Sequence, residues 1–112
     1  FGLSKVQEIV NDNASASWAA DLQKDIATAY AYTLRHEKAA QAYGWSARLH
    51  EAHKDLDGML HCRYYQAIEL EDSNRKYEAL AIYDDLRTNY PKHDIGLLAE
   101  AASIRLRNLA RP

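Results

Sequence analysis

The sequence is poor in the residues that make tight turns, since its 112 residues include only four Gly and two Pro. A fold with many tight turns needs more of both residues. The scarcity therefore favours long helices joined by short loops, and no stretch shows the alternation typical of a strand. The length suits one domain with one continuous core.

Cysteine and net charge are also scarce. The single Cys62 excludes an intramolecular disulfide and paired-cysteine zinc or redox motifs. The 14 Lys and Arg against 16 Asp and Glu give a net charge of -2, so nucleic acid and anionic lipid are not expected partners. No apolar run approaches the roughly 18 residues of a membrane span. We expect a soluble protein. The sequence does not determine its cellular compartment, although the cytoplasm is slightly favoured. The start at Phe1 rather than Met leaves two explanations open, an excised domain and a processed product.

Apolar residues recur at three- and four-residue spacing along the chain, which predicts amphipathic helices. The expected segments are a short N-terminal helix with its linker (1–14), two helix pairs (17–53 and 55–91) and a final helix (94–109). Pro91 ends the second pair because it lacks an amide hydrogen and disfavours helical geometry in the preceding residue.

The spacing also predicts which side chains face the core. In the first long helix the expected buried stripe is Trp18, Leu22, Ile26, Ala29, Tyr30 and Tyr32. In the final helix the residues expected to turn inward are Leu97, Leu98, Ala101, Ile104 and Leu106.

Two parts of the chain share a pattern of small and aromatic residues. The first part supplies the leading positions, with Ile26, Ala27, Tyr30, Ala39 and Tyr43. The second part supplies the trailing positions, with Ala79, Tyr83 and Pro91. Small residues let paired helices pack closely, and the tyrosines fill the space between them. The pattern resembles the tetratricopeptide repeat family.

The chain departs from the family pattern at three places. Gln66 stands where an aliphatic residue is expected, and Glu51 stands where the first copy should have Pro. Ala39 and Ala79 are further apart than the family's period of about 34 residues. The helices of the middle pair, or their connection, must therefore be longer than standard.

The resemblance implies an all-α fold in which antiparallel helix pairs stack as a short α-solenoid, with the 94–109 helix as a C-terminal cap. It also implies that the inner face, built mainly from the first helix of each pair, binds a peptide or a protein surface. Carried over by register, the candidate partner-binding residues are Lys24, Thr28, Tyr32, Tyr64, Ile68 and Glu71. Tyrosines suit interfaces because they combine apolar area with a polar tip, and Tyr32, Tyr64 and Tyr65 are the best surface candidates.

The sequence has neither a Gly-rich phosphate loop nor a GxSxG motif, so no catalytic residue is predicted. We expect a non-catalytic module that binds a protein or peptide. The first alternative is a structural role in which exposed helical faces form a homodimer. A third reading, a helical-bundle metalloprotein or enzyme, would show itself by stoichiometric metal after purification without a chelator. A secondary hypothesis is an acidic partner that docks on Arg105, Arg107 and Arg111.

One cluster has residue types that bind metals, comprising His50, Glu51, His53, His61 and Cys62. His50 and His53 share a helical face, but their spacing differs from the zincin motif, which needs two His four residues apart. We therefore expect solvated histidines, a buried Cys62, and neither a metal nor a cofactor.

Overall fold

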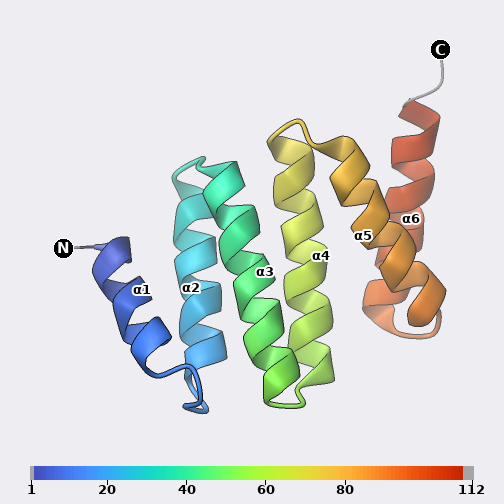
Figure 1. The fold of residues 1–112 in the computed structure, drawn as a ribbon. Helices are drawn as coiled ribbons and strands as arrows, with labels where there is room; N and C mark the ends of the chain where they lie inside the picture. Colours follow the sequence, from blue (N-terminus) through green and yellow to red (C-terminus); the bar gives the residue numbers. More distant parts are fainter. Residues whose placement is uncertain (1, 110–112) are drawn as a thin grey trace.

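The computed structural model describes residues 2–109, and all regular structure within that range is helical. The helices are α1 (Leu3–Asp12), α2 (Ala19–Tyr32), α3 (His36–Ala52), α4 (Leu56–Asp72), α5 (Lys76–Asn89) and α6 (Asp94–Leu109). They follow one another in chain order across the molecule, and each packs against the next (Figure 1). The prediction of an all-α fold is confirmed. Among the described helices, none is both long enough and apolar enough to cross a bilayer.

The middle helices account for the long spacing between the two copies of the repeat pattern. Helices α3 and α4 have 17 residues each, whereas α2 and α5 have 14. Only residues 53–55 join α3 to α4. The helices are therefore longer, and their connection is short.

The same tight turn ends α2, α3 and α4. Each turn has one residue in the left-handed region, with φ of 61° at Leu34, 59° at Lys54 and 68° at Asn74. In each turn an amide after this residue donates back to a carbonyl in the last turn of the helix: Arg35 N to Tyr30 O, Asp55 N to His50 O, and Arg75 N to Leu70 O, at 2.8–2.9 Å. This closure satisfies helix carbonyls that would otherwise lack partners.

Helix α3 is buried on two sides, and its small residues make this possible. Ala39 and Ala42 belong to an apolar cluster shared with α1 and α2, whereas Ala40 and Ala47 belong to a second cluster shared with α4, α5 and α6. A methyl group added at Gly44 would lie 2.6 Å from Nε2 of Gln66 on α4. Small side chains on α3 therefore set its close contact with both neighbours.

Buried polar groups tie α3 to the same two helices. Ser46 is fully buried, and its hydroxyl donates to the carbonyl of Ala20 at 2.8 Å. The Cys62 thiol on α4 donates to the same hydroxyl at 3.3 Å. Burial raises the pKa of the Cys62 thiol. Cys62 is thus a structural residue in the core, as its place in the sequence suggested.

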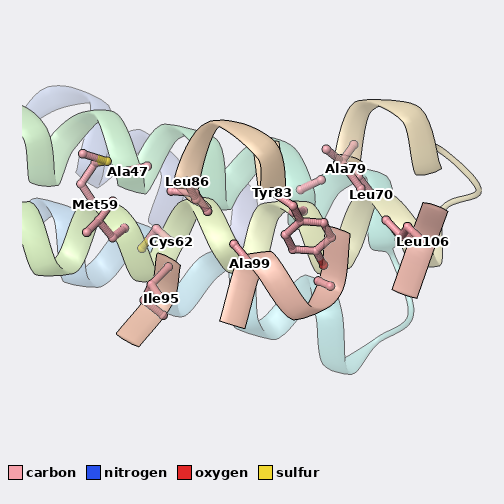
Figure 2. Close-up of a cluster of buried hydrophobic side chains, with 14 residues drawn as sticks. Ala47, Met59, Cys62, Leu70, Ala79, Tyr83, Leu86, Ile95, Ala99 and Leu106 are labelled. Atoms are coloured by element: carbon pink, nitrogen blue, oxygen red, sulfur yellow. The ribbon is translucent and has the colours of Figure 1, made fainter. Parts of the chain in front are cut away.

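The second apolar cluster fills the space between α3, α4, α5 and α6. Figure 2 shows it as a continuous row of side chains, with Ala47 and Met59 near one end and Leu106 near the other. Tyr83 lies within this row and is fully buried. Its ring packs against Tyr64 on α4, with the ring centroids 5.7 Å apart. The row anchors α5 and α6 to the rest of the molecule.

Several residues expected to be buried are exposed, at the two ends of α2 and on α6. Trp18 precedes α2 and is 45% exposed, and Tyr32 is 84% exposed at the end of that helix. In α6, Leu97, Leu98 and Ile104 are each about half exposed. The burial predictions were wrong for two reasons. Trp18 and Tyr32 lie at the two ends of α2, whereas α6 packs mainly against α5, so its broad apolar stripe leaves one face uncovered. The separate expectation that Tyr32 lies at the surface is confirmed.

Gly96 provides a direct test of how closely α6 packs. A methyl group at this position would overlap the backbone carbonyl oxygen of Tyr90, because the two atoms would be 1.7 Å apart. We expect Gly96→Ala to lower the free energy of unfolding by about 3 kcal/mol, since backbone must move to make room. Urea denaturation measures this change.

Gly44→Ala is the matched comparison, because its new methyl group would meet only the flexible end of Gln66. We expect a clearly smaller loss of stability. Equal losses for the two variants would show that the Tyr90 carbonyl does not limit this packing.

Candidate functional site

The first three predicted binding residues lie along α2 on the side that faces α4. The Lys24 ammonium is 5.6 Å from the centre of the Tyr65 ring on α4. The Thr28 and Tyr43 hydroxyls are hydrogen-bonded at 3.0 Å, and Tyr32 is largely exposed one helical turn further on. We call the surface made by α2 and α4 around these residues the α2–α4 face.

A cavity of about 350 Å³ opens on the α2–α4 face near the end of α2. Its lining residues are Thr28, Ala31, Tyr32, His36, Tyr43, Glu69 and Asp72. Two of the predicted binding residues, Thr28 and Tyr32, thus share this cavity with five residues that were not predicted to bind a partner. We call this space the Glu69 cavity.

The Glu69 cavity holds two carboxylates and one imidazole. Nδ1 of His36 lies 2.9 Å from Oε1 of Glu69 and 3.9 Å from Oδ2 of Asp72. Glu69 is only 7% exposed, whereas the side chain of Asp72 is half exposed. The two carboxylates lie near the C-terminal end of α4, where the helix dipole adds further negative potential.

The cavity wall opposite these acids is neutral and polar. Burial raises the pKa of the Tyr43 phenol, and the nearby Glu69 acts in the same direction. The hydrogen bond with Thr28 has the opposite, smaller effect. Tyr43 therefore stays protonated at neutral pH and keeps its hydroxyl paired with Thr28.

A second cavity, of about 280 Å³, opens further along the same face toward the start of α2. We call it the His50 cavity, and its lining residues are Asp21, Lys24, His50, Asp55, Asp57, Gly58 and His61. Nδ1 of His50 is 3.0 Å from Oδ2 of Asp55. Nε2 of His50 is buried without a hydrogen bond, and Oδ1 of Asp21 lies 3.7 Å away.

The other three predicted binding residues lie outside both cavities. Tyr64 packs on the Tyr83 ring, and Ile68 is half-buried. Glu71 accepts two hydrogen bonds from Arg105 at 2.8 and 3.0 Å, and one from the Tyr83 hydroxyl at 2.6 Å. Glu71 thus joins α4 to α5 and α6, and its carboxylate is already paired within the chain.

The arginines proposed for an acidic partner are also paired internally. Arg105 contacts Glu71, and Arg107 forms a 2.6 Å ion pair with Asp84. Hydrogen bonds from Arg107 hold the pKa of Asp84 well below its usual value. Arg111 lies outside the described residues. Because Glu71 and Asp84 neutralise their charges, Arg105 and Arg107 attract an acidic partner less strongly than unpaired arginines would.

The histidine cluster of the sequence does not converge on one point. His50 contacts Asp55, whereas Nε2 of His53 lies 3.4 Å from the carbonyl of Ala14. Nδ1 of His61 contacts the carbonyl of Asp57 at 2.8 Å. Instead, His36, Glu69 and Asp72 bring their ligand atoms within 4.8 Å of one another. The only signal in the sequence was the pairing of Glu69 and Asp72 at three-residue spacing, because His36 comes from another helix.

Scans against protein-family models, curated proteins and solved structures give no match for this chain. The likeness to tetratricopeptide repeats therefore depends on the residue pattern described above.

Glu71 gives a prediction about acid stability. Burial raises the pKa of Glu71, but the hydrogen bonds from Arg105 and Tyr83 outweigh burial and leave the pKa below its usual value. A carboxyl group with a lowered folded-state pKa stabilises the protein above its unfolded-state pKa and loses this effect as pH falls. We expect Glu71→Gln to be less stable than wild type at pH 7 and to lose less stability on acidification to pH 3.

Chemical denaturation at a series of pH values measures this difference. Asp25→Asn serves as the control, since Asp25 is exposed. Parallel pH profiles for wild type and Glu71→Gln would contradict the paired state of this carboxylate.

Proposed function

We propose that this chain is a non-catalytic protein-interaction module of the tetratricopeptide kind, which binds an extended peptide segment along the α2–α4 face. The observation that carries the proposal is the alignment of two cavities on that face. Both are lined by residues of α2 selected by register, Lys24 in the His50 cavity and Thr28 and Tyr32 in the Glu69 cavity.

The dimensions suit a short extended segment. From Lys24 to Tyr32 the helix rises about 12 Å, at 1.5 Å per residue. An extended peptide covers this distance with about four residues. Two side chains of such a segment would enter the two cavities, and the Lys24 ammonium would donate a hydrogen bond to a backbone carbonyl of the peptide.

The charges of the face favour a basic segment. Asp21, Asp55 and Asp57 line the His50 cavity, where Lys24 is the one permanent cation. Hydrogen bonding by the Gly58 amide lowers the pKa of Asp55 and keeps it ionised. Lys or Arg side chains of a partner would meet a surplus of carboxylates, which favours encounter and register.

Selection from a random displayed peptide library tests the proposal. We expect enrichment of peptides with one or two Lys or Arg residues. The variant Asp21→Asn with Tyr32→Ala should bind the selected peptides at least about tenfold more weakly, because central aromatic residues often contribute most to binding. Raising the salt concentration should also weaken binding of these peptides by wild type, because salt screens the attraction between charges.

Arg48→Ala is the matched control. Arg48 is exposed on α3, and it lines neither cavity of the α2–α4 face. This variant should bind as wild type does. Enrichment of peptides without basic residues would refute the proposed face. Equal binding by the double variant and wild type would refute it as well.

A second candidate function, self-association, is favoured by one specific observation. Helix α6 exposes Leu97, Leu98, Ile104 and Leu109, by 49% to 71%. Apolar side chains gathered on a terminal helix are typical of a surface that another molecule covers. A homodimer through α6 would leave the α2–α4 face open, so this role does not exclude peptide binding.

Light scattering during size-exclusion chromatography tests self-association independently of peptide binding. A monomer at micromolar concentration would count against self-association and would leave the peptide-binding proposal unaffected. A dimer that Leu97→Glu together with Ile104→Glu dissociates would support self-association through α6. The double variant keeps the buried side of α6, formed by Ile95, Ala99, Ala102 and Leu106, unchanged.

A further inference from the structure

The two carboxylates of the Glu69 cavity, Glu69 and Asp72, differ from the half-buried carboxylates elsewhere in the basic residues that pair with them. Elsewhere the carboxylates are paired with arginine: Glu71 with Arg105, Asp84 with Arg107, and Asp85 with Arg63. Within residues 2–109, the only basic side chain that pairs with Glu69 or Asp72 is His36. A carboxylate as buried as Glu69 is costly to leave ionised without compensation. The cavity is therefore suited to a bound cation.

The donor atoms are those that transition metals prefer. Zinc accepts both imidazole nitrogen and carboxylate oxygen as ligands, at metal–ligand distances of about 2.0–2.2 Å. Calcium and magnesium prefer oxygen ligands alone, so the imidazole disfavours them. The chemistry thus selects a divalent transition metal.

The positions of the ligand atoms are close to those that such an ion needs. Around a tetrahedral ion at these distances, ligand atoms lie about 3.3 Å apart. The His36 nitrogen is 2.9 Å from Glu69 and 3.9 Å from Asp72, and all three ligand atoms lie within 4.8 Å of one another. Asp72 is exposed, so its side chain can move toward the ion, whereas packing holds Glu69 in place.

The cavity also has room for the remaining ligands of the ion. Its volume of about 350 Å³ leaves room for water molecules beside a bound ion. Thr28 and Tyr43 offer hydroxyls in the same cavity for a metal-bound water. The site would therefore resemble an open zinc site, with three protein ligands and solvent in the fourth position.

We propose that His36, Glu69 and Asp72 bind one divalent transition-metal ion, best matched by zinc, in the Glu69 cavity. The ion replaces the contact between His36 and Glu69 and supplies the positive charge that these carboxylates lack.

Isothermal titration calorimetry with zinc chloride tests this site. The protein is first purified in the presence of a chelator, which is then removed by dialysis. We expect one ion per chain and a higher melting temperature in the presence of zinc. His36→Ala, Glu69→Gln and Asp72→Asn should each weaken binding at least about tenfold. Asp72→Asn changes an exposed side chain, so its result does not depend on a change in folding.

Cobalt provides a spectroscopic readout, since a tetrahedral nitrogen and oxygen site gives visible absorption that the three variants should lose. His93→Ala is the matched control, because His93 contacts Asp57 near the opposite end of α4, and it should bind zinc as wild type does. Absence of stoichiometric binding, or binding that the three variants leave unchanged, would overturn the proposal. These titrations need no peptide, so their failure is distinct from a failure of the proposed function.

Discussion

The packing of α3 between α2 and α4 is the constraint on which the rest of the structure depends. Alanines on two sides of α3 allow both neighbours to approach closely, and the buried Ser46 hydroxyl contacts Ala20 of α2 and Cys62 of α4. This packing fixes the spacing of α2 and α4, which in turn determines the size of both cavities. A larger side chain at Ser46 would separate the helices and open the α2–α4 face.

The charges divide the molecule into two regions with different properties. Around α5 and α6, arginines neutralise Glu71 and Asp84, so these residues serve mainly to hold helices together. On the α2–α4 face, Glu69 and Asp72 have only His36 as a basic partner among the described residues. Carboxylates paired with arginine hold helices together, whereas Glu69 and Asp72 have no arginine partner among the described residues, and this contrast is the basis of the proposed metal site.

Helical periodicity was sufficient to predict the fold class, because apolar spacing along a helix is a local property of the sequence. It could not predict which side of α6 is buried, since that depends on how many helices surround it. The turns at Leu34 and Lys54 gave no signal either, because neither residue type favours the left-handed region. Helical register along α2 was the basis for choosing Thr28 and Tyr32, and both line the Glu69 cavity. The contact of His36 with Glu69 depends on tertiary packing, so the sequence did not indicate it.

The most direct test of the central claim, that the α2–α4 face is the binding surface, is a nitrogen–proton correlation NMR titration of the chain with a selected basic peptide. The account predicts that chemical-shift changes concentrate on the amides of α2 from Lys24 to Tyr32 and on α4 around Tyr65 and Asp72. Shift changes centred on α6, with the α2–α4 face unaffected, would contradict it.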